Sequence, residues 1–340
     1  MSSLNLLLEE NAKKGNLNEV KTLVEKGADI HAKSEYALRL SAQAGHLNIV
    51  KYLIEKGADI HVNSEEAFTQ SAYNGHLDIV KFLVEKGADI HADSEGALRW
   101  SAERGHLDVV KYLVEQGADI HAANECALSR SAEYGHFNVV KYLVKKGANI
   151  HVDSEGALRF SASSGYLDTV KYLVEQGADI HAKSEEALRY SAGMGHLDIV
   201  KYLVEKGADI HICDDLALRW SAECGHLDVV KFLVEKGADI HANEDVAFRW
   251  SAEYGHLDVV KYLVENGAHV CVIGSFLWGH NRVHPDVVKY LLEKGANIPN
   301  DPYTKKMIVK CSFEIKLSLI QKNDVIYSID AYIGEWLWKP

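Results

Sequence analysis

Histidine and cysteine are the residue types in this sequence that suggest chemistry first. The 340 residues include 18 histidines and five cysteines, and both side chains bind transition metals or take part in catalysis. Most of the histidines form two series with a spacing of 30 residues, His31 to His241 and His46 to His256, with Tyr166 replacing one member of the second series. Such a spacing places successive members on successive copies of a repeated unit, not around one site.

A metal site would need several of these side chains to converge. Neighbouring copies of a helical unit lie about 8–10 Å apart, which Zn–N bonds of about 2.1 Å cannot bridge. The densest group in the sequence consists of His211, Cys213, Cys224 and His226. Cys213 and Cys224 are expected at the two ends of one helix and therefore about 15 Å apart. The sequence predicts no metal site and no cofactor.

The sequence also lacks the common catalytic motifs. It contains no GxGxxG, GxxxxGK[ST], HExxH or GxSxG pattern. Serine, histidine and aspartate are frequent, but they recur from copy to copy, whereas an active site needs one unique, preorganised group of side chains. We therefore predict that the protein is not an enzyme.

The charge balance argues against nucleic acids and membranes as partners. The 37 basic and 49 acidic residues give a net charge of −12, whereas both kinds of surface attract basic patches. No apolar run approaches the roughly 18 residues of a membrane span, and the first residues lack the features of a secretion signal. An odd number of cysteines without a CxxC pair favours a reducing compartment. We expect a cytoplasmic protein, with the nucleus as an alternative.

A repeat of 30 residues runs through most of the chain. Glycine recurs in steps of 30 from Gly45 to Gly255, and a second glycine series runs from Gly27 to Gly267. Residues 95–124 read EGALRWSAERGHLDVVKYLVEQGADIHAAN. The pattern predicts two helices per copy, each ending at a glycine with a positive φ. Helices of about ten residues are unstable alone, so the copies must stack on one another.

Local signals set the expected limits of the two helices. Ser94 has the side chain of an N-cap, and Gly105 is expected to end the first helix. Glu95 and Arg99 are four residues apart, so we expect an ion pair between them within this helix. The second helix is expected to begin at Asp108.

The segment GHLDVVKYLVEQGADIHA, residues 105–122, resembles the second half of an ankyrin repeat, GHLEVVKLLLxxGADVNA. SxxALRxSA stands where ankyrin repeats carry TPLHxAA. The chain resembles in particular the ankyrin proteins that large DNA viruses encode in many copies. The resemblance implies an all-α ankyrin-repeat solenoid of about eleven stacked helix-turn-helix units. Because the unit is shorter than the family's usual length of about 33 residues, we expect shortened fingers between the copies.

The copies differ along the chain. We expect an N-terminal capping repeat at 1–34, eight regular repeats at 35–274, a degenerate repeat at 275–298, and a diverged C-terminal repeat and cap at 299–340. Terminal copies must replace an apolar stacking face with a soluble one, so divergence at both ends is expected. An alternative for the tail is a recruiting motif, because viral ankyrin proteins often end in an F-box-like segment.

The positions that vary between copies indicate where a partner could bind. They share one face of the first helix, the face that lines the concave groove in ankyrin proteins. Aromatic and arginine side chains, which dominate binding hot spots, are frequent there. The expected partner-binding residues are Trp100, Arg104, Arg130, Tyr134, Phe160, Tyr190, Trp220, Trp250 and Tyr254. The alternative is that these aromatic residues only cover the contacts between copies.

These observations predict a non-enzymatic scaffold or adaptor that binds a partner protein on its concave face and is itself a monomer. The rival hypothesis is a structural protein that associates with itself, as a particle component or a spacer.

Two further series of residues are expected to be structural. The aromatic series from Tyr52 to Tyr290 is nearly uniform, which predicts packing between copies. The series that begins at His46 is expected to hydrogen-bond a neighbouring loop. If both histidine series are packed as neutral donors, their protonation destabilises the fold between about pH 7.5 and 5.5.

Overall fold

The computed structural model describes residues 3–270 and 284–296. Every regular element in these ranges is a helix. The chain divides into two compact units, Met1–Ala182 (unit 1) and Lys183–Pro340 (unit 2). Among the described residues, no helix combines the length and the apolar character that crossing a membrane requires.

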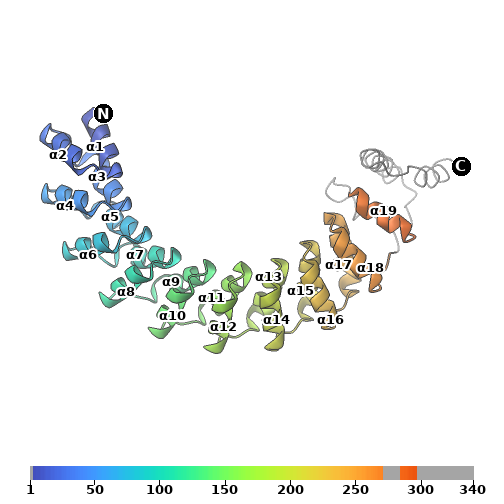
Figure 1. Cartoon of the computed structure of the whole chain (residues 1–340). Coiled ribbons are helices and arrows are strands. Elements are labelled where there is room, and N and C mark those ends of the chain that lie inside the picture. The colour runs from blue at the N-terminus through green and yellow to red at the C-terminus, as the bar shows by residue number, and fades with distance from the viewer. Residues whose placement is uncertain (1–2, 271–283, 297–340) are drawn as a thin grey trace. The chain divides into compact units, whose positions relative to one another are not determined.

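Unit 1 consists of helix pairs that follow the repeat of the sequence. Its first helices are α1 (Ser3–Lys14), α3 (Ala32–Gln43), α5 (Val62–Tyr73), α7 (Ala92–Glu103), α9 (Ala122–Glu133) and α11 (Val152–Ser164). Its second helices are α2 (Leu17–Glu25), α4 (Leu47–Glu55), α6 (Leu77–Glu85), α8 (Leu107–Glu115), α10 (Phe137–Lys145) and α12 (Leu167–Glu175). Each first helix packs on the next first helix, and each second helix on the next second helix. The two kinds of helix therefore form two rows, with the first helices on the inner side of the curve of unit 1 (Figure 1).

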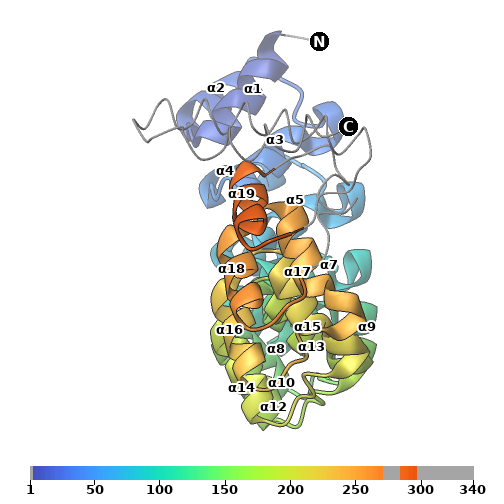
Figure 2. The same cartoon turned by 90° about the vertical axis from the view of Figure 1, so that its right-hand side faces the viewer.

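Unit 2 repeats this arrangement. Its first helices are α13 (Ala182–Gly193), α15 (Ile212–Glu223) and α17 (Ala242–Tyr254), and its second helices are α14 (Leu197–Glu205), α16 (Leu227–Glu235), α18 (Leu257–Glu265) and α19 (Pro285–Glu293). In Figure 2, α13, α15 and α17 lie on one side of the unit and α14, α16 and α18 on the other. Helix α18 also packs on α19.

The core of each unit lies between its two rows. In the copy formed by α7 and α8, the side chains that are at most 1% exposed include Ala97, Leu98, Ala102, Val109, Val110 and Leu113. Burying a valine or leucine side chain stabilises the fold by about 1.5–3 kcal/mol. Most copies bury the same set, whereas the first copy has Leu7 and Glu19, both exposed, at two of these positions. The hydroxyl of Ser101 is fully buried as well and donates to the carbonyl of Leu98 at 3.1 Å. Stacking therefore supplies the stability that the short helices lack alone.

The start of each first helix differs from the expected N-cap. Asp93, Ser94 and Glu95 have φ values of 53°, 50° and 62°, so they form a left-handed turn ahead of the right-handed part of α7. The prediction that Ser94 is an N-cap is wrong, because a cap residue has an extended backbone. The same turn precedes the first helices from α3 to α17. A left-handed residue with a side chain costs about 1–2 kcal/mol, so other contacts must hold the turn.

An arginine of the first helix supplies such contacts. Arg99 donates from Nε to the carbonyl of Ser94 at 2.9 Å and from Nη2 to the carbonyl of Asp93 at 2.7 Å. The guanidinium group suits this task because its planar fork presents several donors at once. Arginines at the same position of other copies donate to their own turns: Arg39, Arg159, Arg189, Arg219 and Arg249.

The predicted pairing of Glu95 with Arg99 is wrong. Arg99 forms its ion pair with Asp93 at 3.1 Å, whereas the carboxylate of Glu95 accepts a hydrogen bond from Nδ1 of His91 at 2.5 Å. The left-handed turn rotates Glu95 out of the helix, so the spacing of four residues no longer places it beside Arg99.

The links between copies are short. Gly117 ends α8 in a turn, and Oδ1 of Asp119 then accepts the backbone N–H of His121 at 2.9 Å. No strand projects from the links among residues 3–270, which confirms the expected shortening of the fingers. The second helix of this copy begins at Leu107, one residue before the expected start.

The domain boundaries remain predictions. Of the degenerate repeat expected at 275–298, the structure describes 284–296, which contains α19. The diverged repeat and cap expected at 299–340, and the alternative of a recruiting motif there, lie outside the described residues.

Candidate functional site

The predicted partner-binding residues all lie on first helices or at their C-terminal ends. Trp100, Arg104, Arg130, Tyr134 and Phe160 belong to unit 1, and Tyr190, Trp220, Trp250 and Tyr254 belong to unit 2. We refer to these residues as the first-helix surface of each unit. Trp100, Tyr134 and Tyr254 are 37%, 45% and 43% exposed. Arg104 and Arg130 are exposed too, and Phe160, Tyr190, Trp220 and Trp250 are half-buried.

In unit 1 these side chains contact one another from copy to copy. Tyr73 of α5 packs edge-on against Trp100 of α7, with ring centroids 6.3 Å apart. The guanidinium of Arg104 lies 4.5 Å from the centroid of the Tyr73 ring. Arg130 of α9 donates to Glu133 at 2.9 Å. Aromatic, cationic and anionic groups therefore lie beside one another on α5, α7 and α9.

In unit 2 the aromatic residues are stacked. The rings of Tyr190 in α13 and Trp220 in α15 lie 5.6 Å apart at an interplanar angle of 21°. Arg189 lies 5.6 Å from the centroid of the Trp220 ring, and Arg219 lies 5.7 Å from that of Trp250. An arginine that holds a left-handed turn thus also supports an aromatic ring on the next copy.

The structure shows packing between copies at these positions, and partner binding there stays a prediction. The aromatic residues do cover the contacts between neighbouring copies, yet several keep more than a third of their surface in water. The prediction omitted Tyr73 and also Met194, which is 56% exposed. Met194 occupies the repeat position of Tyr134 and Tyr254, so comparison of the copies could have found it.

The other aromatic series is packed differently. Tyr52 of α4 has the ammonium groups of Lys21, from the preceding copy, and Lys56 each at 5.6 Å from its ring centroid. Burial raises the pKa of the Tyr52 hydroxyl. Similar lysine contacts flank later members of the series. The predicted packing between copies is confirmed, and lysine side chains shield these rings.

The histidine series that begins at His46 joins consecutive copies. Nε2 of His136 donates to the carbonyl of Glu103, in the preceding copy, at 2.7 Å. Equivalent bonds are made by His46, His76, His106 and His256. The expected hydrogen bond to a neighbouring loop is confirmed.

The series that begins at His31 is not packed as expected. His31 donates from Nδ1 to the turn residue Glu35 at 2.6 Å, and 58% of its side chain is exposed. The hydrogen bond to Glu35 and the charge of that carboxylate raise the pKa of His31, and the same cause raises the pKa of His61, His91 and His121. For these four histidines the expected loss of stability on protonation has the wrong sign, because the folded state favours the protonated ring.

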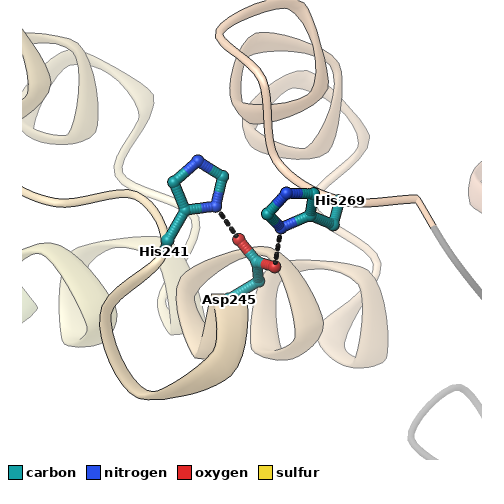
Figure 3. A group of neighbouring side chains, drawn as sticks. All are labelled: His241, Asp245 and His269. Carbon is teal, nitrogen blue, oxygen red and sulfur yellow. Dashed lines mark hydrogen bonds and ion pairs between the residues drawn. The ribbon is translucent and has the colours of Figure 1, made fainter.

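One cluster in unit 2 departs from the repeat. Asp245, in the turn of α17, accepts hydrogen bonds from Nδ1 of His241 at 2.7 Å on Oδ1 and from Nδ1 of His269 at 2.9 Å on Oδ2 (Figure 3). The two imidazole rings lie 4.4 Å apart. This cluster differs from the densest group of histidines and cysteines in the sequence, which contains Cys213 and Cys224.

Comparison with known families agrees with the geometry of the repeat. The family model for ankyrin repeats in three copies matches residues 8–94, 91–154, 128–214, 158–244 and 188–273. The chain belongs to the ankyrin-repeat family. No curated protein matches the chain significantly.

Membership in this family has a functional consequence. Ankyrin repeats are generally protein–protein interaction modules and are typically non-enzymatic. The helix pairs, the stacking and the short links described above are those of an ankyrin solenoid within each unit.

Proposed function

We propose that this ankyrin-repeat protein is a non-enzymatic scaffold or adaptor that binds a partner protein on its first-helix surfaces. The observation that carries the proposal is the contrast between the two aromatic series. Several rings on the second helices, such as Tyr52 and Phe82, have a lysine ammonium on each side, whereas Trp100, Tyr134 and Tyr254 on the first-helix surfaces remain 37%, 45% and 43% exposed. Exposed aromatic residues beside arginines are the usual composition of binding hot spots.

The spacing of the row suggests what the partner presents. Packed helices lie about 8–10 Å apart, and a polyproline II segment has three residues per turn and advances about 3.1 Å per residue, so every third side chain lies on the same face about 9.3 Å further along. We therefore propose a partner segment of this conformation with an apolar side chain at every third residue. Stacking and the arginine contacts already order the first-helix surfaces. Binding therefore costs little conformational entropy in this chain, which favours affinity.

Affinity purification with mass spectrometry tests the proposal. Wild type is compared with the combined variant Trp100→Gln, Trp220→Gln and Trp250→Gln. Glutamine is chosen because Gln70 already occupies this position in another copy. We expect the combined variant to stay folded and to lose a partner, since a hot-spot side chain contributes about 2 kcal/mol or more, about 30-fold in Kd for each tryptophan.

The matched control is Tyr166→His. Tyr166 is as exposed as Trp100, at 37%, but it precedes α12 in the other row, and histidine is the usual residue of its series. The control should retain every partner. Identical partner lists for wild type and the tryptophan variant would refute the proposal. Recovery of the chain's own copies alone would favour a self-associating structural protein and contradict a monomeric adaptor.

We also propose that the protein resides in a reducing compartment, the cytoplasm or the nucleus. Cys213 and Cys224 are exposed and Cys126 is half-buried, and all three are free thiols. Oxidising compartments favour disulfides between such groups.

A further inference from the structure

The cluster of His241, Asp245 and His269 arises from a change in the repeat at one link. Eight earlier links carry a short acidic or amide residue at the position of His269: Asp29, Asp59, Asp89, Asp119, Asn149, Asp179, Asp209 and Asp239. Histidine occurs there in this link alone among these nine. The change places a second imidazole beside the carboxylate of a left-handed turn.

The preceding copy shows what the usual residue does. Oδ1 of Asp215 accepts Nδ1 of His211 at 3.0 Å and also the backbone N–H of Asp239 at 3.1 Å. In the next copy the carboxylate of Asp245 instead receives one imidazole nitrogen on each oxygen, at 2.7 and 2.9 Å. A backbone contact has thus been replaced by a side chain that is a good metal ligand.

The geometry of the three groups suits a metal ion. One ligand atom from each residue can be chosen so that the three atoms lie within 4.8 Å of one another. Bonds of about 2.1 Å at tetrahedral angles require ligand atoms about 3.4 Å apart. The side chains of His241 and His269 are 42% and 62% exposed and that of Asp245 is 13% exposed, so the rings are free to adjust and the ion can enter from water. Figure 3 shows both rings directed at the same carboxylate.

We propose that His241, Asp245 and His269 bind one Zn²⁺ ion, with water completing the coordination. Two imidazoles and one carboxylate are a ligand set that zinc uses when one position is left open. Mg²⁺ is a poorer fit, because it prefers oxygen ligands and keeps its own waters. The ion joins the turn of α17 to the link that follows α18, so it fastens the first and second helices of this copy to each other.

The protons balance as follows. Zinc takes the place of the hydrogen-bonding proton on Nδ1 of each histidine. A neutral ring releases that proton to water and gains one from water on Nε2, with no net change. An imidazolium already carries the Nε2 proton and releases one proton to solvent, so the affinity for zinc falls in acid.

The test is a zinc titration of the full-length chain by calorimetry, with the thiols kept reduced. We expect His269→Asn to bind one ion fewer than wild type, or to bind it at least about tenfold more weakly, which is the scale of loss when a metal site is disturbed. Asparagine occupies this position of the link as Asn149 in another copy, so the variant should fold normally, which thermal melting with a chelator verifies. In wild type, zinc should also raise the melting temperature.

His211→Ala is the matched control, because His211 occupies the position of His241 in the preceding copy. Its partner Asp215 accepts a backbone N–H, that of Asp239, where Asp245 accepts a second imidazole. This variant should bind zinc as wild type does. The proposal is overturned if wild type takes up no zinc, or if His269→Asn and wild type give the same titration. It is also overturned if His211→Ala loses as much zinc affinity as His269→Asn, or if Mg²⁺ raises the melting temperature as zinc does.

Discussion

Gly105 and His136 show how single residues join two copies. The φ of Gly105 is 77°, and a Cβ at this position would overlap the ring of His136 from the next copy. The same ring donates to the carbonyl of Glu103. Glycine is therefore required here for two reasons, a left-handed backbone and a close side-chain approach. The sequence predicts the left-handed backbone, because glycine ends helices. The close approach depends on which side chain of the neighbouring copy lies against the glycine.

Gly105→Ala should destabilise the fold more than Gly117→Ala. Gly117 also has a positive φ, 100°, but no atom lies within 4 Å of a Cβ built there. We expect a loss of about 1–2 kcal/mol for Gly117→Ala from the backbone alone. Gly105→Ala should lose a further 1–3 kcal/mol or so from overpacking. Urea denaturation of both variants measures the difference, and equal losses would contradict the role assigned to His136.

The left-handed turn is the element that the sequence did not reveal. The C-terminal ends of the helices, the stacking and the framework histidines follow from glycine spacing and from comparison of the copies. Ser94, in contrast, has the features of an N-cap, and three consecutive left-handed residues other than glycine are unfavourable by local sterics. The turn is held by side-chain contacts over four to six residues, from Arg99 to its carbonyls and between Glu95 and His91, which helical periodicity alone does not indicate.

The histidines of four turns make the stability of the fold depend on pH. The pKa of His31, His61, His91 and His121 is raised by the hydrogen bond to the turn glutamate. A raised pKa in the folded state adds stability that is complete below the unfolded pKa near 6.5 and is lost as pH rises through the folded pKa. We therefore expect the contribution of these four histidines to the free energy of unfolding to increase as pH falls toward the unfolded pKa near 6.5.

A variant with all four histidines replaced by glutamine isolates this effect. Its free energy of unfolding should rise less than that of wild type over the same pH range, because the groups that still titrate are common to both proteins. Urea denaturation at several pH values provides the comparison. Equal pH dependence in both proteins, or a fall in stability for wild type alone, would contradict the pairing of these rings with the turn glutamates.

Across the chain, the repeat separates a uniform row from a variable one. The second helices carry nearly the same residues in every copy, and lysines shield their aromatic rings. The first helices vary, and their variable positions include exposed side chains such as Trp100 and Met194. Repetition of one sequence unit is enough to explain why the second helices are uniform. The variation is expected if the first-helix surfaces are adapted to a partner.

Whether the partner contacts the first-helix row is the central question, and site-specific photo-crosslinking answers it most directly. A benzophenone amino acid replaces Tyr134, on the first-helix surface of unit 1, or Tyr166, which is exposed in the other row. Both proteins are irradiated in cell extract, and the crosslinked products are identified by mass spectrometry. We predict a specific partner crosslinked from position 134 and absent from position 166. A partner captured from position 166 and not from position 134 would contradict binding on the first-helix surfaces.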